Sequence, residues 1–358
     1  MQKNLVFLFF FSFLWTFYGQ KNSAFADSIR IKHNIPELSY AVVSSDSILE
    51  IQALGYQRIN AAAKADIDDK FRLGSLTKTV TSYIAAILVK QGKLKWDTNF
   101  FDLYPELKAQ SNPRYYDFTL RDFITFRANI PTWSYGNTTL AEKEIKGNDQ
   151  QQRYEFIAWF FKQNKVLSEK QDVYYSNMSY VAAGLMLEKA AGKSYEKLVK
   201  ELGDELSINF GFGQPNLLNQ NQPWGHDENL IPEKPALNYK LNWLSSAGNI
   251  NSSLPDYCKF TQMQLQGLLG KSKVLSKEEF NLMHHGLFEF SYGWYSETNK
   301  NSDLQYSFHY GNPGTFLTKV YICKAVNKAF IIFCNVQSEE ADKGLMLLLE
   351  KLQKQYGG

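Results

Sequence analysis

The chain has 358 residues, of which 44% are hydrophobic and 21% charged, and its formal net charge is +3 at pH 7. These values are typical of an ordinary globular protein, and the length allows one large two-lobed unit or two domains. Because acidic and basic residues nearly balance and no basic block occurs, a nucleic-acid partner is excluded.

The first 26 residues have the pattern of a secretory signal peptide. Lys3 precedes the apolar run "LVFLFFFSFLW", which is shorter than the ~20 residues that a membrane-spanning helix needs. Small residues follow, as they do at a cleavage site. We expect cleavage after Gly19 or after Ala26, export to the periplasm or the cell exterior, and no integral membrane segment in the mature chain. An uncut leader that anchors the protein is the alternative.

The first part of the mature chain predicts a buried helix. "VTSYIAAILVKQGKL" is apolar on most faces, so it predicts a core helix that ends near Gly92. Ser75 would lie in the first turn of this helix, with Lys78 one turn later on the same face. Burial and the positive helix end lower the pKa of such a lysine, which favours a proton acceptor, and the free N–H of the serine can stabilise an oxyanion.

The same serine–lysine spacing occurs again at Ser194 and Lys197, so the spacing alone is weak. "AAGKSYEKLVKELGDEL" has one charged and one apolar face, which predicts an amphipathic surface helix. Ser194 would cap that helix and Lys197 would be solvated. We therefore assign the nucleophile to Ser75.

A serine–lysine pair needs a further proton-transfer group and a second oxyanion donor. "VYYSNMSY" offers Tyr175 and Asn177 where a polar turn leads into an apolar helix. "FHYGNPGTF" offers His309 and Gly311 beside glycines that allow close approach of the backbone. A core tyrosine and a strand-capping histidine are the alternatives for Tyr175 and His309.

The C-terminal part predicts a strand pair. "KVYICKAVNKAFIIFCNV" has apolar flanks around a turn at 325–328, which places Cys323 opposite Phe330. That register keeps Cys323 and Cys334 too far apart for a disulfide. Together with Cys258, they are expected to be buried free thiols.

Three short motifs follow one another along the chain: Ser75 with Lys78, Tyr175 with Asn177, and His309 with Gly311. In this order they resemble the motifs of the serine β-lactamase-related superfamily. The chain looks most like the branch that holds class C β-lactamases, DD-peptidases and esterases. The surroundings are similar too, from "FRLGSLTKTVTSYIAAILVKQGKLKWDTNFFDLYPEL" to "SSAGNINSSLPDYCKF", and the similarity spans about 35–336. The residues that carry it are Ser75, Lys78, Tyr175, Asn177, His309 and Gly311.

The resemblance implies an α/β fold, more closely an α+β sandwich, of the β-lactamase and transpeptidase type. An antiparallel sheet flanked by helices would be joined to a mainly helical lobe. Its strands would come from 39–45, 48–56 and the C-terminal strand pair, and a last helix at 339–355 would pack on it. Residues 27–358 would form a single catalytic domain. Its sheet lobe would comprise about 27–95 and 240–358, its helical lobe about 96–239, and the site would lie between the lobes.

The resemblance also implies a mechanism for the three central residues. Ser75 would attack a carbonyl carbon while Lys78 and Tyr175 share the removal of its proton. Water would then release the acyl-enzyme, with Tyr175 as the base.

Four further residues would bind the substrate. The N–H groups of Ser75 and Asn312 would hold the oxyanion beside Gly311. Asn177 would orient the lysine and a substrate amide. His309 would bind the substrate or assist the leaving group, and it would carry charge only as the pH falls toward its ordinary value of about 6.5.

The sequence departs from the family pattern at three places. Before Pro131 the family usually has a histidine, a small hydroxylated pair and a glycine, whereas this chain has Phe126–Asn129. The usual Pro-Gly turn before the tyrosine motif is replaced by 169–172. His309 stands where class C β-lactamases carry a lysine, which weakens the expected binding of a β-lactam carboxylate.

The sequence therefore favours an exported serine hydrolase that forms an acyl-enzyme on ester or amide bonds. It would act as an esterase, a D-amino-acid peptidase or DD-carboxypeptidase, or a weak β-lactamase, on small molecules or peptides that include peptidoglycan fragments. The alternative is a non-hydrolytic penicillin- or peptidoglycan-binding or sensing protein, which the altered 126–129 segment favours. No cofactor or metal is expected, since the adjacent His284 and His285 would point apart on a helix.

Overall fold

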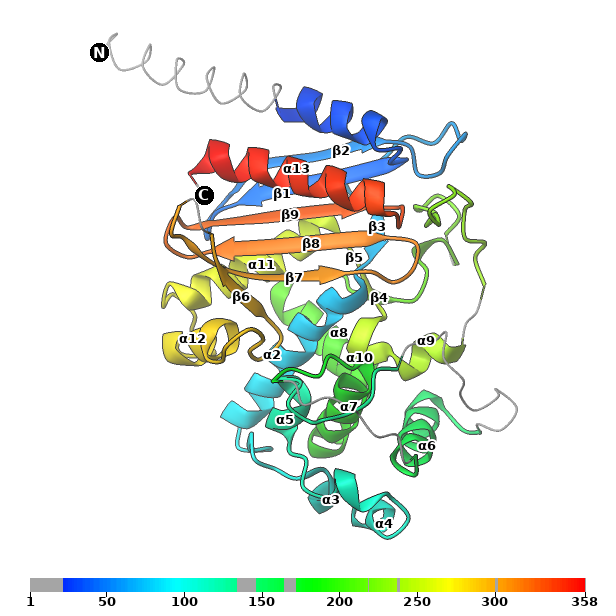
Figure 1. The fold of residues 1–358 in the computed structure, drawn as a ribbon, viewed down its shortest axis with the longest axis vertical. Helices are drawn as coiled ribbons and strands as arrows, with labels where there is room; N and C mark the ends of the chain where they lie inside the picture. The colour runs from blue at the N-terminus through cyan, green and yellow to red at the C-terminus, as the bar shows by residue number, and fades with distance from the viewer. Residues whose placement is uncertain are drawn as a thin grey trace.

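The computed structural model describes residues 22–133, 146–163, 172–217, 219–236, 239–299 and 302–357. Most of the predicted leader, 1–21, lies outside these residues. A six-stranded antiparallel sheet has the strand order β2-β1-β9-β8-β7-β6, so strands from both ends of the chain lie side by side (Figure 1). Its strands are β1 (Glu37–Val43), β2 (Ile48–Gly55), β6 (Tyr295–Thr298), β7 (Gln305–Gly311), β8 (Leu317–Cys323) and β9 (Lys328–Cys334).

Helices cover both faces of this sheet. A helix over 22–32 and α13 (Glu339–Tyr356) lie along one face, and α11 (Leu254–Leu268) packs on the other (Figure 1). In β1, Leu38 belongs to the hydrophobic core on the face covered by α13, and Ala41 belongs to the core on the face covered by α11. Side chains that alternate between the two faces of a strand require this arrangement. The predicted antiparallel sheet with the last helix packed on it is confirmed.

The other helices gather mainly at one end of the molecule, below the sheet in Figure 1. A three-stranded sheet of order β3-β5-β4 lies beside them. The helices are α2 (Thr77–Lys90), α3 (Phe100–Leu103), α4 (Pro105–Lys108), α5 (Leu120–Ile124), α6 (Asp149–Phe161), α7 (Asn177–Ala191), α8 (Tyr195–Leu206), α9 (Tyr239–Trp243), α10 (Ser245–Gly248) and α12 (Lys277–His285); the strands are β3 (Lys70–Arg72), β4 (Gly211–Phe212) and β5 (Ile250–Ser253).

Helix α2 is buried on most of its surface, as predicted from its apolar sequence. It ends at Lys90, and Gly92 has the left-handed conformation (φ 70°) that commonly follows a helix end. This core helix carries Lys78 and contacts α7 and α10. It therefore places the lysine where these elements meet.

The predicted register of the β8–β9 hairpin is wrong by two residues. Cys323 pairs with Lys328, and Phe330 lies opposite Tyr321. The four-residue turn needs a left-handed residue, and Asn327 supplies it (φ 52°). The conclusion about the thiols holds, because all three cysteines are buried and free.

The described part of the chain contains no helix that is both long and apolar enough to cross a membrane. Within the same residues, no group of three histidine, cysteine or acidic side chains is arranged to hold a metal ion.

Candidate active site

Ser75 lies in a short 3₁₀ turn, η1 (Gly74–Leu76), directly before α2. We expected it inside the first turn of the α-helix, but the helix begins two residues later, at Thr77. Gly74 has φ 53°, and a Cβ there would lie 2.9 Å from the ring of Pro313 and 3.0 Å from the nitrogen of Asn312. A glycine is therefore required for the turn to approach the loop that follows β7.

Lys78 is fully buried and points its amine at three oxygen atoms. Nζ lies 3.0 Å from Ser75 Oγ, 2.8 Å from Asn177 Oδ1 and 2.6 Å from the carbonyl oxygen of Ala247. These acceptors favour an ammonium group, but none of them is charged. Burial lowers the pKa of Lys78 well below its ordinary value. The structure thus places a lysine that readily loses its proton beside the Ser75 hydroxyl.

Tyr175 approaches Ser75 from the other side, and its hydroxyl oxygen lies 2.6 Å from Ser75 Oγ. Tyr175 precedes α7 by two residues, and Asn177 is the first residue of that helix. Burial raises the pKa of Tyr175 above its ordinary value. The hydroxyl therefore stays protonated at neutral pH, and it can pass on a proton more readily than it can act as a phenolate base.

The backbone N–H groups of Ser75 and Asn312 belong to two segments that approach each other: both residues line one small hollow, and a Cβ on Gly74 would lie 3.0 Å from the Asn312 nitrogen. Among the described residues, neither group donates a hydrogen bond within the protein. The end of β7 is held against η1, because a Cβ on Gly311 would lie only 2.0 Å from the carbonyl oxygen of Leu73. The predicted pair of oxyanion donors is thus brought together by a close approach that only glycine permits.

His309 is completely buried on β7, and Lys78 is near enough to affect its pKa. Burial, with a smaller effect of the lysine, lowers the pKa of His309 to about 3. The expectation that it charges toward pH 6 does not hold in this environment. Its Nδ1 lies against the backbone of Tyr310, whereas Nε2 has no partner among the described residues. The ring is therefore a buried, neutral group, and it does not line the hollow beside Ser75.

The departure at Phe126–Asn129 places an aromatic ring behind the tyrosine. Phe126 is buried, and its ring centroid lies 4.6 Å from that of Tyr175 and 4.6 Å from that of Phe290. The other departure, at 169–172, lies almost entirely outside the described residues.

The competing serine–lysine match is a helix cap, as predicted. The Ser194 side chain accepts a hydrogen bond from the N–H of Lys197 at the start of α8, and Lys197 is exposed. His284 is also accounted for, because its two ring nitrogens contact Ser307 and Gln264.

Sequence reasoning missed several contributors to the site. The segment that contains Ala247 resembled a family segment, but nothing in it showed that its carbonyl binds Lys78. A small hollow of about 80 Å³ beside the nucleophile was not predicted either. Its lining includes Arg72, Ser75, Asn177, Leu241, Leu244 and Asn312.

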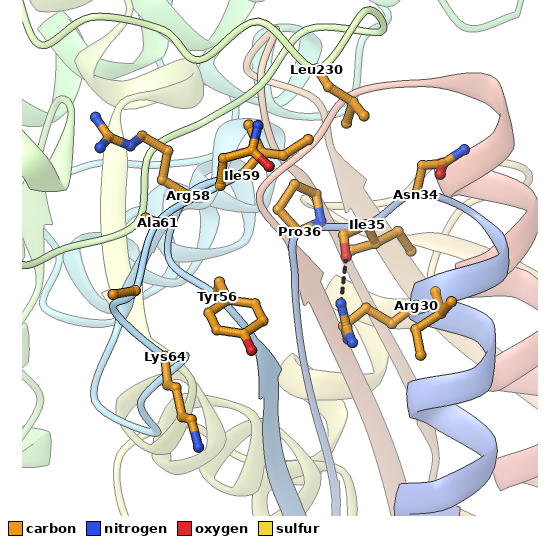
Figure 2. A pocket seen from close by; sticks show the side chains of 13 residues that line it. Arg30, Asn34, Ile35, Pro36, Tyr56, Arg58, Ile59, Ala61, Lys64 and Leu230 are labelled. Atoms are coloured by element: carbon orange, nitrogen blue, oxygen red, sulfur yellow. Dashed lines mark hydrogen bonds between the residues drawn. The ribbon is translucent and has the colours of Figure 1, made fainter.

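A more open groove of about 780 Å³ lies between the helix over 22–32 and the loop that follows β2 (Figure 2). Arg30 on its wall is paired with Asp27 and with the carbonyl oxygen of Ile35, and Arg58 lies over the ring of Trp224. Ser75 lines the small hollow and not this groove, so the chemistry is assigned to the hollow.

Comparisons with known proteins agree with this arrangement. In sequence, the chain is 22% identical to Protein flp of Staphylococcus aureus (strain COL) over 334 residues, which cover 90% of this chain and 64% of that protein. The chain thus spans a little under two thirds of the length of that curated relative.

Three solved structures have a similar fold. A penicillin-binding protein homologue from Pyrococcus abyssi has a TM-score of 0.73 at 19% identity, covering 92% of this chain and 77% of that one. A class C β-lactamase has a TM-score of 0.73 at 17% identity, covering 93% and 97%. SurE, solved with D-Leu, has a TM-score of 0.73 at 17% identity, covering 94% and 75%.

A family model described as Beta-lactamase matches residues 22–353, which is nearly the whole described chain and includes every residue of the site. The chain therefore belongs to the Beta-lactamase family, whose fold is that of serine hydrolases.

Proposed function

We propose that this protein is an exported serine hydrolase that cleaves ester or amide bonds through an acyl-enzyme. One observation carries the proposal: Ser75 Oγ lies within hydrogen-bond distance of both the Tyr175 hydroxyl and the Lys78 amine. A serine becomes a nucleophile when a neighbouring group can take its proton. Export is supported by the signal-peptide pattern of the first residues.

In the acylation step, Ser75 Oγ attacks the carbonyl carbon and Lys78 takes the hydroxyl proton. The N–H groups of Ser75 and Asn312 stabilise the oxyanion, a contribution of about 3–4 kcal/mol for each donor. Tyr175 gives its proton to the leaving group, and the Lys78 ammonium then reprotonates the tyrosine, so both side chains are neutral again in the acyl-enzyme. Deacylation reverses these proton transfers. Tyr175 takes a proton from the attacking water and passes its own to Lys78, and the lysine returns a proton to Ser75 Oγ as the product leaves.

The charges around Ser75 favour an uncharged substrate. Arg72, which lines the small hollow, is paired with Glu233, and His309 is neutral because of its low pKa. Among the described residues that line the hollow, Arg72 is the only cationic side chain, and its pairing with Glu233 weakens the binding of a β-lactam carboxylate. We infer that neutral esters and amides are cleaved faster than β-lactams. The similarity to SurE, solved with D-Leu, supports D-amino-acid amides as a second class.

A substrate panel tests the proposal. The purified protein is assayed with a short-chain p-nitrophenyl ester, a D-alanyl-D-alanine peptide and nitrocefin. The ester should give the highest kcat/KM and nitrocefin the lowest. The variant Ser75→Ala should lose turnover by several orders of magnitude, whereas Ser194→Ala, which changes the other serine–lysine match, should keep it. Nitrocefin as the best substrate would contradict the substrate assignment.

The alternative, a penicillin- or peptidoglycan-binding protein that is acylated without turnover, has a different signature. Under either hypothesis a fluorophosphonate would label Ser75, but only a hydrolase would release more than one product molecule per chain. Peptide mapping by mass spectrometry locates the label. A label on Ser194, or turnover that survives Ser75→Ala, would rule out Ser75 as the nucleophile.

A further inference from the structure

The segment in which this chain departs from its family forms a wall behind Tyr175. We propose that Arg127 is a positioning residue: its guanidinium fastens the 286–290 segment to the end of α5, and the aromatic wall held in this way keeps the Tyr175 hydroxyl against Ser75. The inference rests on the proposed function, because it concerns the geometry of the same proton transfer.

The first support is the backbone of Phe126. Helix α5 ends with the Phe126 N–H bonded to the Phe123 carbonyl and the Arg127 N–H bonded to the Asp122 carbonyl. This pattern ends a helix with a left-handed residue, which is usually glycine. Phe126 adopts that conformation (φ 57°), although it is strained for a bulky side chain. The carbonyl oxygen of Phe126 then accepts a hydrogen bond of 2.7 Å from the N–H of Tyr174.

The second support is the set of contacts made by Arg127. One terminal nitrogen donates to the carbonyl oxygen of Thr125 at 2.6 Å and to that of Phe290 at 2.8 Å. The other donates to the carbonyl oxygen of Phe288 at 3.0 Å. These acceptors are up to 163 residues away along the chain. A planar guanidinium can hold several carbonyls at fixed angles, which the single point charge of a lysine cannot do.

The third support is the chain of rings that this contact holds. Phe290 is buried, and its centroid lies 4.6 Å from that of Phe126 and 5.9 Å from that of His309. Phe126 in turn lies 4.6 Å from the ring of Tyr175. Arg127 therefore reaches the tyrosine through two rings and His309 through one, without touching any reacting atom.

The main test is the variant Arg127→Gln, with Arg30→Gln as its matched control. Arg30 also bonds a carbonyl oxygen, that of Ile35, but it lies on the distant groove (Figure 2). A misplaced proton-transfer group slows chemistry more than binding. We expect Arg127→Gln to lower kcat for the ester by about 10- to 100-fold with KM changed less than threefold. The control should keep kcat within twofold.

A second variant tests the ring itself and leaves Arg127 in place. Phe126→Gly keeps the left-handed backbone, which glycine adopts without strain, and removes the buried ring that contacts Tyr175, Tyr180 and Phe290. It relieves the strain of the α5 turn but leaves a cavity in the core, so its folding is checked by circular dichroism, and it should lower kcat in the same range. Phe126→Leu keeps an apolar side chain but not the aromatic contact, so its kcat should lie between those of Phe126→Gly and the native protein.

A spectroscopic readout separates this inference from the proposed function. With ¹³Cζ-labelled tyrosine, the Tyr175 signal is assigned by its loss in Tyr175→Phe. This signal should move in Arg127→Gln and in Phe126→Gly but not in Arg30→Gln, whether or not the protein turns over substrate. An unmoved signal, or unchanged kcat in a folded Arg127→Gln, overturns the inference while native turnover leaves the proposed function intact. If the native protein shows no turnover but the Tyr175 signal still moves in the two variants, the proposed function is contradicted and the positioning role of Arg127 is not.

Discussion

At the residue scale, burial drives both groups that contact the Ser75 hydroxyl toward their neutral forms. It lowers the pKa of Lys78 and raises that of Tyr175, and the same effect holds His309 uncharged. A neutral amine can take a proton and a neutral phenol can give one. The site can therefore move a proton without creating an isolated charge before the oxyanion forms.

The first prediction concerns pH. Protonated Lys78 cannot accept the serine proton, so kcat/KM should be lost as the pH falls through its lowered pKa and should rise on a single limb well below pH 10.5. Because Tyr175 keeps its proton, activity should remain level to about pH 10. The measurement is kcat/KM for a neutral ester, with the rate of Ser75→Ala subtracted. A decline between pH 8 and 10, or a second limb near pH 6, would contradict these assignments.

The second prediction concerns Gly311. A Cβ in Gly311→Ala would lie 2.0 Å from the carbonyl oxygen of Leu73 and 2.5 Å from Thr318 Oγ1, so the end of β7 must shift. The oxyanion donor of Asn312 would move with it, and loss of one donor lowers kcat by about 100- to 1,000-fold. Gly92→Ala is the control, because its Cβ would meet open space even though the Gly92 backbone is left-handed (φ 70°), which that of Gly311 is not. Equal kcat values for the two variants would refute the argument.

The sequence could predict that Ser75 and Lys78 lie side by side, because residues three apart share one face of a helical turn. It could not predict the roles of Ala247 and Arg127. The first acts through a backbone carbonyl, which every residue has, and the second acts through partners more than 160 residues away. Such contacts exist only once the whole chain is folded.

At the element scale, one buried arginine joins four helices. Arg153 of α6 donates to Glu188 of α7, to Glu196 of α8 and to Asn242 of α9. Arg153 and Glu188 are both almost inaccessible to solvent. Breaking such a pair leaves an uncompensated charge in the core.

The third prediction follows from this pair. Arg153→Met should lower the free energy of unfolding by about 3–5 kcal/mol, measured by denaturant titration. The double variant Arg153→Met/Glu188→Leu removes both charges and should recover part of the loss. A double variant that is less stable than the single one would show that the ion pair itself is not responsible.

The fourth prediction concerns the two possible ends of the leader. Asn22 donates to Glu50 at 2.8 Å, and Ala26 is fully buried in the core beneath α13. Cleavage after Ala26 would remove both contacts, whereas cleavage after Gly19 would keep them. We therefore expect the mature protein to begin at Gln20, as N-terminal sequencing can test. A start at Asp27 would contradict this prediction.

The boundaries of the elements were easier to predict than their pairing. The helix that the resemblance implied at 339–355 matches α13, and its apolar residues repeat with the helical period. The β8–β9 register was wrong because a left-handed Asn327 allows a tighter turn than the sequence pattern indicated. A two-residue slip keeps every side chain on the same face of the sheet, so the pattern could not reveal the error.

At the scale of the whole molecule, the site exists only where distant segments meet. Ser75 follows β3, Tyr175 precedes α7, and His309 lies on β7. The resemblance predicted this convergence, which no single segment shows. The contacts that support it, from Arg127 to Phe290, join two segments 163 residues apart, and no sequence pattern in either segment predicts that they meet.

The central pairing of the large sheet also has a consequence for biosynthesis. The N–H of Glu37 in β1 is bound by Asn335, 298 residues later in the chain. At roughly 5–20 residues per second, a ribosome needs on the order of 15–60 s to make that partner. Until then β1 and β2 form only a two-stranded hairpin, which is marginal in water. The nascent chain thus emerges without a closed tertiary structure, a state that can still be threaded through a membrane pore.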